Sequence, residues 1–273
     1  MCRVLGITNF DYSRHQKIVA RFCELARSGA VMAEDPPGHE DGWGLAFYQE
    51  GKLVVHKSGV SLLEETDKVI RILSTAQNSP VMILHLRKSA WGDRLSTRHA
   101  HPFHFNNTVF FHNGVVYDYQ GLIPDITLPG LGADALDTEV LFYHVMSGEA
   151  QNLARAFLDT ASLIKRQHKY SALNCLFSDG VKLFAYRDYA KEPDYYSLYK
   201  AFSGNSSFVS SEPLDKKIRW EMMAQEEFLA IDPGDFACST TGELMQNSTR
   251  KTKTEPAGRV PPDALLLSRR RQK

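Results

Sequence analysis

Apolar residues recur along this chain with two different periods. Ile18, Phe22 and Leu25 stand at helical spacing and predict an amphipathic helix over residues 14–28. The same criterion predicts three further helices, at residues 64–77, 137–147 and 151–168.

Short runs rich in β-branched and aromatic residues, bounded by turn residues, predict strands. The first strand covers residues 2–8 and starts directly after Met1. The others are expected at Trp43–Gln49, Lys52–Lys57, Val81–Leu86, Thr108–Phe111, Ala172–Ser178, Lys182–Tyr186, Ser207–Ser211, Phe228–Ile231 and Asp235–Ser239. Strands outnumber helices and the two kinds of element occur in mixed order, which favours an α+β fold with largely antiparallel sheets.

Composition and charge exclude several classes of protein. The 273 residues are 43% hydrophobic and 23% charged, which is enough for one large domain with a substantial core. Thirty-two basic residues balance 32 acidic ones, so no global field draws the chain to nucleic acid or to an anionic membrane. No apolar run approaches the roughly 20 residues of a membrane span, and the start of the chain does not resemble a signal peptide.

The four cysteines are few and widely spaced: Cys2, Cys23, Cys175 and Cys238. No CxxC pair occurs, which suits a reducing cytoplasm and argues against a disulfide framework. The composition becomes polar, Pro-containing and basic after about residue 246. We therefore expect a domain over residues 2–245 and a flexible basic tail over 246–273.

Cys2 is the first candidate for chemistry. After loss of Met1 it would carry a thiol and a free α-amine on one residue. The amine has an ordinary pKa of about 7.7–8.0 against about 8.5 for the thiol. Part of the amine is therefore neutral at physiological pH and can take the proton of the thiol, so that the chain end supplies the base for its own nucleophile.

Four later motifs have both a structural and a catalytic interpretation. The glycine-rich run Gly38–Tyr48 is either a turn before a strand or a loop that lets the backbone approach a ligand. Arg87, at the end of a predicted strand, is either a surface residue or a bidentate ligand for a carboxylate. Asn113 and Gly114 are either a type I′ hairpin turn or the two donors of an oxyanion hole. Asp137 either caps a helix or binds an ammonium group.

The histidines raise the possibility of a metal site, because the run His99–His104 and His112 could form a cluster. Pro102 interrupts any regular element there, and no HExxH motif or Cys/His pairing is present. We expect no metal and no cofactor.

The order of these motifs is more specific than any one of them. Cys2 is followed by DGWG, LHLRKSAWG, HAHPF, HNG and DTE, and this series resembles the class II glutamine amidotransferases, which are N-terminal nucleophile hydrolases. The resemblance covers about residues 2–240 and implies a four-layer αββα sandwich of two mainly antiparallel sheets. The chain differs from several members at Lys88–Trp91 and at His99-Ala100. DGWG and RKSAWG resemble a stand-alone subgroup that includes γ-glutamyl hydrolases of thiol metabolism.

The resemblance also implies a role for each motif residue. Cys2 is the nucleophile and its α-amine the base, while Asn113 and Gly114 form the oxyanion hole. Arg87 binds the α-carboxylate of the substrate and Asp137 its α-amine. The remaining residues carried over to the site are His101, Trp43 and Gly44.

The expected function is hydrolysis of the side-chain amide of glutamine, or of a γ-glutamyl amide, through a γ-glutamyl thioester. About 30 residues follow the core, too few for a synthase domain. Three alternatives stay open: a glutaminase subunit that passes ammonia to a separate synthase partner, a non-catalytic regulatory subunit with the same fold, and a metal-dependent hydrolase. The possible protein partner is a separate synthase or peptidase subunit.

Overall fold

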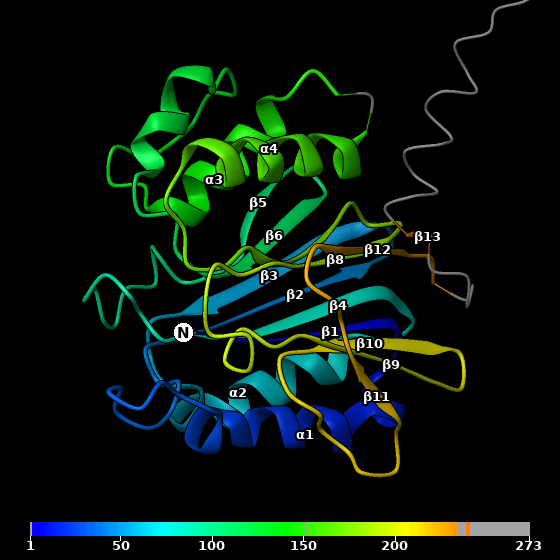
Figure 1. The fold of residues 1–273 in the computed structure, drawn as a ribbon. Helices are drawn as coiled ribbons and strands as arrows, with labels where there is room; N and C mark the ends of the chain where they lie inside the picture. Colours follow the sequence, from blue (N-terminus) through cyan, green and yellow to red (C-terminus); the bar gives the residue numbers. More distant parts are fainter. Residues whose placement is uncertain (1, 151, 234–238, 241–273) are drawn as a thin grey trace, which may run out of the picture.

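The computed structural model describes residues 2–150, 152–233 and 239–240. Two antiparallel sheets are stacked face to face and each is covered by a pair of helices on its outer side, which gives four layers in the order α, β, β, α (Figure 1). The α+β fold expected from the sequence is confirmed.

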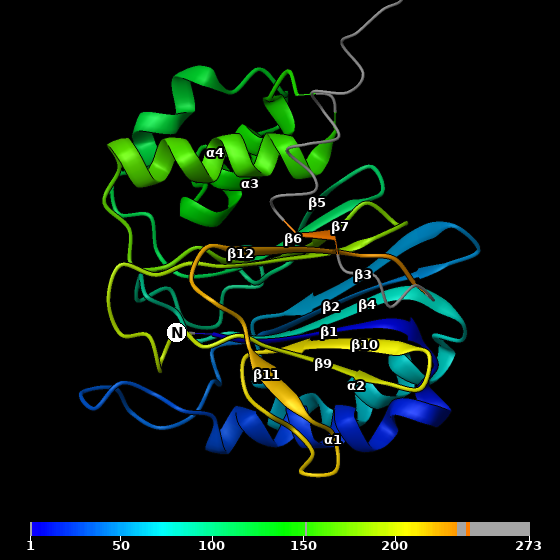
Figure 2. The same cartoon turned by 45° about the vertical axis from the view of Figure 1, so that its right-hand side comes forward.

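The first sheet has seven strands in the order β11-β9-β10-β1-β4-β2-β3. Its strands are β1 (Arg3–Phe10), β2 (Trp43–Gln49), β3 (Lys52–Ser58), β4 (Ser79–Leu86), β9 (Tyr199–Ser203), β10 (Ser206–Ser210) and β11 (Trp220–Met222). Helices α1 (Tyr12–Ser28) and α2 (Leu62–Thr75) cover its outer face, as Figures 1 and 2 show.

The second sheet has six strands in the order β13-β12-β8-β7-β6-β5. Its strands are β5 (Phe103–Phe105), β6 (Thr108–Asn113), β7 (Asn174–Ser178), β8 (Leu183–Arg187), β12 (Glu227–Ile231) and β13 (Ser239–Thr240). Helices α3 (Asp137–Ser147) and α4 (Leu153–Gln167) lie on its outer face, and a 3-10 helix, η1 (Tyr119–Asp125), contacts α3.

Side-chain alternation along the strands builds three stacked cores. In β1, Leu5 and Ile7 point to the layer of α1 and α2, whereas Val4 joins the core between the sheets. The third core packs the phenylalanines of β6, β7 and β12 against α3 and α4. Both faces of each sheet are therefore buried, and the central strands have almost no exposed positions.

All predicted helices and most predicted strands are present, with shifts of a few residues at their ends. The sequence interpretation missed the short strands β5, β9 and β11. Residues 234–238, which hold most of the last predicted strand and Cys238, lie outside the described residues. So do the predicted domain boundary at residue 245 and the tail at 246–273. No helix in the described part of the chain is long and apolar enough to cross a membrane.

Candidate active site

The candidate nucleophile lies where the ends of several strands meet. Strands β1 and β4 are antiparallel with Arg3 opposite Leu86, so the residue before β1 faces the residues after β4. Cys2 accordingly contacts the backbone of Lys88: its sulfur lies 3.6 Å from the Lys88 carbonyl oxygen and accepts the Lys88 N–H at 3.4 Å. Cys2 is only 7% exposed.

A cavity of about 40 Å³ opens beside Cys2, where strand ends meet the start of α3. Five of the residues implied by the resemblance line it together: Cys2, Arg87, His101, Gly114 and Asp137. They come from four separate parts of the sequence, and antiparallel pairing plus the start of α3 brings them to one place.

Asn113 and Gly114 stand at the end of β6 and do not form a hairpin turn. Asn113 pairs with Asn174 of β7, about 60 residues later, and the hairpin that contains β6 turns instead at Asn106 between β5 and β6. Asn113 is 2% exposed, and its side-chain oxygen has no hydrogen-bond partner among the described residues. The turn interpretation of Asn-Gly is therefore wrong.

Gly114 is required by close packing. A Cβ atom there would lie 1.9 Å from the carbonyl oxygen of Ala172 and 2.6 Å from His112 Nε2. No other residue type lets the backbone pass this near to its neighbours, and Gly114 lines the cavity.

Arg87 and Asp137 line opposite parts of the cavity and both are buried. The Arg87 guanidinium holds the carboxylate of Asp93, with Nη2 at 2.7 Å from each carboxylate oxygen. Asp137 accepts the indole N–H of Trp91 at 3.1 Å and the backbone N–H of Val116 at 3.0 Å. Both side chains of this pair therefore already have hydrogen-bond partners inside the protein.

Burial is the main influence on Asp137 and raises the pKa of its carboxyl, which His112 opposes from 4.0 Å away. His112 Nε2 lies 3.0 Å from the Ala172 carbonyl oxygen, so this nitrogen carries the proton. Its Nδ1 then accepts a hydrogen bond from the Thr138 hydroxyl at 3.1 Å. These contacts fix the start of α3 against the end of β6.

His101 lines the cavity as a neutral ring. Burial, reinforced by His85, holds the pKa of His101 well below its ordinary value. The two rings lie 4.3 Å apart, and neither has a hydrogen-bond partner within the described residues. His101 therefore gives the site shape and polarity rather than a positive charge.

The structure does not bring the Trp43 side chain to the site. Trp43 is fully buried in the core beneath α1 and α2, where its indole N–H donates to Glu65 at 2.9 Å. Strand alternation turns its neighbour Gly44 toward the other sheet. There a Cβ would lie 1.7 Å from the His101 carbonyl oxygen, so Gly44 acts only by allowing His101 to approach β2.

Arg3 is a site residue that the sequence interpretation missed. It is 1% exposed, donates to the carbonyl oxygen of Cys2 at 3.0 Å and pairs with Glu212 at 2.6 Å. A charged residue inside an apolar strand was the available signal. The sequence interpretation also missed Asp93 as the partner of Arg87 and Trp91 as the partner of Asp137. No rule of sequence spacing relates these loop residues to their partners.

The other described cysteines are buried elsewhere. Burial raises the pKa of Cys23 to about 12, and that of Cys175 well above its ordinary value, which makes them poor nucleophiles. No group of three or more His, Cys, Asp or Glu side chains is placed to hold a metal ion within the described ranges.

This chain is similar to several known proteins. A protein of Methanocaldococcus jannaschii, described as uncharacterized protein MJ1515, is 28% identical over 244 residues, which is 80% of this chain and 66% of that protein. The chain thus spans slightly less than two thirds of that relative.

Among solved structures, the glutamine phosphoribosylpyrophosphate amidotransferase of B. subtilis matches 88% of this chain with a TM-score of 0.64 at 17% identity. An allosteric regulatory enzyme of purine biosynthesis matches 88% of this chain with a TM-score of 0.65 at 19% identity. The chain spans only 48% of either enzyme. A class-II glutamine aminotransferase domain protein of Silicibacter pomeroyi is 19% identical with a TM-score of 0.55, and the match covers 98% of it.

These solved structures share the fold of this chain. The sequence profile of the class-II glutamine amidotransferases matches residues 1–201, most of the described structure. The chain therefore belongs to the class-II glutamine amidotransferase family.

Proposed function

We propose that this chain is an N-terminal-cysteine amidohydrolase that cleaves the side-chain amide of glutamine or of a γ-glutamyl compound. One observation carries the proposal: the Cys2 thiol shares a single small cavity with Gly114, Arg87 and Asp137. The cavity is therefore lined by a nucleophile and an oxyanion donor. It is also lined by one group for each charge of an α-amino acid head.

The first half of the reaction follows from these positions. Once Met1 is removed, the α-amine of Cys2 takes the thiol proton and the thiolate attacks the δ-carbonyl carbon. The Gly114 N–H and the Asn113 amide stabilise the oxyanion. The C–N bond then breaks, the α-ammonium gives its proton to the leaving nitrogen, and ammonia or an amine departs from a γ-glutamyl thioester.

Water completes the reaction. The α-amine takes a proton from water, whose oxygen attacks the thioester carbon; the C–S bond breaks, glutamate leaves and the sulfur regains its proton. Arg3 is a positioning residue, because its hydrogen bond to the Cys2 carbonyl holds the nucleophile in place.

The decisive experiment measures glutamate release by the full chain from glutamine, glutathione and other γ-glutamyl amides. We expect intact mass to show that active protein begins at Cys2, and hydroxylamine to trap the thioester as γ-glutamyl hydroxamate. Cys2→Ala should abolish both products. Cys23→Ala is the matched control, because it changes a buried thiol outside the cavity and should leave turnover unchanged.

Three results would contradict the proposal: no glutamate from any amide, full activity in Cys2→Ala, or full activity in protein that retains Met1. Equal amounts of ammonia and glutamate in the absence of other proteins would indicate hydrolysis. A glutaminase subunit should instead need its synthase partner before it releases either product.

A further inference from the structure

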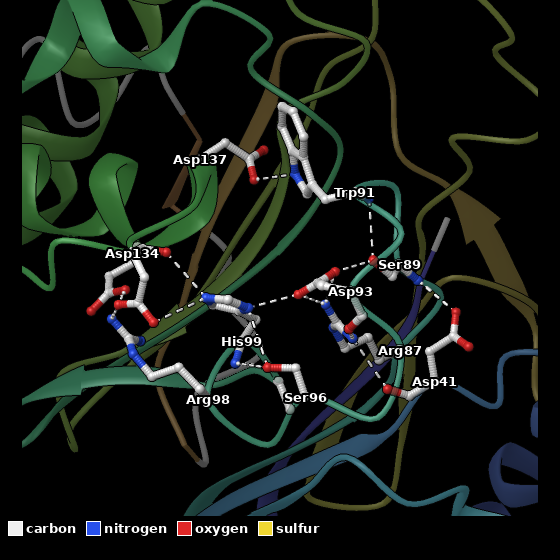
Figure 3. A network of polar contacts seen from close by, with 12 residues as sticks. Asp41, Arg87, Ser89, Trp91, Asp93, Ser96, Arg98, His99, Asp134 and Asp137 are labelled. Carbon is white, nitrogen blue, oxygen red and sulfur yellow. Dashed lines mark hydrogen bonds and ion pairs between the residues drawn. The ribbon is translucent and has the colours of Figure 1, made fainter.

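One loop supplies partners to both side chains expected to bind the substrate head. We call residues 88–100, between β4 and β5, the covering loop. Figure 3 shows its Asp93 directed at Arg87 and its Trp91 directed at Asp137. Lys88–Trp91 also line the cavity of Cys2.

Asp93 reproduces the contacts that a substrate α-carboxylate would make. Both of its carboxylate oxygens lie 2.7 Å from Arg87 Nη2, and its backbone carbonyl accepts from Nη1 at 3.0 Å. Burial opposes the charge on Asp93, but hydrogen bonds from Ser89, Arg87 and His99 lower its pKa. Arg87 is 3% exposed, and this carboxylate forms an ion pair with it.

Trp91 plays the corresponding part for the α-ammonium. Its indole N–H donates to Asp137 Oδ1 at 3.1 Å, on a carboxylate that is 4% exposed. The indole is 40% exposed, and the ring of Tyr119 lies edge-on to it with the ring centroids 5.8 Å apart.

The side chains expected to bind the substrate head are occupied while these contacts stand. Asp93 holds Nη1 and Nη2 of Arg87, and Trp91 holds Oδ1 of Asp137. The covering loop has to give up these contacts before a substrate takes the same positions. Loss of Asp93 takes the paired carboxylate from the buried Arg87, and loss of Trp91 takes one hydrogen-bond donor from the buried Asp137, so each loss is compensated only if the ligand replaces it.

We propose that Asp93 and Trp91 are specificity-determining residues, whose contacts with Arg87 and Asp137 are exchanged for the α-carboxylate and α-ammonium of the substrate. A ligand with both charges replaces both contacts, whereas an amide with one charge leaves one buried group unpaired or still covered. This inference rests on the proposed function and adds a reason for selectivity toward zwitterionic amides.

The proposal predicts that weakening the internal contact tightens binding. Asp93→Asn removes the ion pair with Arg87 and so destabilises the covered form. The substrate complex does not contain this ion pair and is not destabilised. Apparent affinity is proportional to the fraction of molecules in the uncovered form, so the variant should lower KM by about ten- to hundredfold. Trp91→Phe removes the N–H donor and keeps an aromatic ring.

Three substrates separate the two contacts: glutamine, glutaric acid monoamide, which lacks the amine, and 4-aminobutanamide, which lacks the carboxylate. Asp93→Asn should lower KM for the first two only. Trp91→Phe should lower KM for glutamine and 4-aminobutanamide only. Asp134→Asn is the control, because Asp134 contacts Arg98 and His99 of the same loop but not Arg87.

Binding of glutamine to the full chain carrying Cys2→Ala, followed by calorimetry, gives a readout independent of turnover. If Asp93→Asn raises KM for all three amides alike, Asp93 only supports the fold and the proposal fails. If that variant does not fold, Trp91→Phe decides, and an unchanged KM for glutamine overturns the proposal. A wild-type chain that hydrolyses none of the amides would instead refute the proposed function.

Discussion

Gly114→Ala is the most direct test of the oxyanion hole, because the structure fixes what the added methyl group meets. The Cβ would lie 1.9 Å from the Ala172 carbonyl oxygen, about 1.5 Å inside ordinary contact at 3.4 Å. Ala172 is fully buried, and its carbonyl also accepts from His112. Burial and this hydrogen bond hold the Ala172 carbonyl group in place, so the backbone at Gly114 has to shift.

The expected loss of activity follows from that shift. An oxyanion donor acts at about 2.7–3.1 Å, and a displacement of about 1.5 Å removes it. We expect turnover to fall about 10²–10³-fold, equivalent to about 2.7–4 kcal/mol of transition-state stabilisation. KM should change much less, because the negative charge exists mainly in the transition state.

The assay is steady-state glutamate release per folded molecule, with thermal unfolding measured on the same samples. Overpacking alone lowers the free energy of unfolding by about 1–3 kcal/mol, so Gly6→Ala is the matched control. Its Cβ would lie 2.8 Å from Leu176 Cδ2 between the sheets, away from the cavity, and should lower stability without lowering turnover. Near-normal turnover in folded Gly114→Ala would refute the role of this N–H.

Three further outcomes are expected. Asn113→Asp places a carboxylate beside a developing negative charge and should lower turnover at least about 10²-fold with little change in KM. A rise in KM as large as the fall in turnover would point to disrupted substrate binding instead. Because burial raises the pKa of Asp137, protonation should weaken ammonium binding at a higher pH than for an ordinary aspartate. KM for glutamine should therefore rise on acidification. The rise should be absent in Asp137→Asn and absent with glutaric acid monoamide, which has no amine. A rise that persists in either case would mean that Asp137 does not bind the ammonium group. Burial lowers the pKa of His85 to about 3 from 6.5, so the unfolded chain binds one more proton between these values and stability is lost as pH falls through this window. His85→Gln should reduce the slope of unfolding free energy against pH by up to about 1.4 kcal/mol per unit, measured by denaturant titration, and an unchanged slope would mean that His85 is protonated in the fold.

The sequence by itself determined the helices, most of the strands and the order of the candidate site motifs. The residues of α3 and β2 were predicted at their observed bounds, because long periodic or β-rich segments carry local signals. The motif order was enough to indicate the family and to select Cys2, Arg87, His101, Gly114 and Asp137, which the fold brings to one cavity.

Only the tertiary structure decided which way side chains point and what they touch. Both faces of β2 are buried, so its pattern could not tell that Trp43 faces α1 and α2 while Gly44 faces His101. Asn-Gly has the same local propensity in a hairpin as at the end of β6, and only pairing with β7 separates the two. The contacts of Asp93 with Arg87 and of Trp91 with Asp137 arise where a loop folds back over the ends of strands. They depend on long-range chain geometry, which no local pattern records.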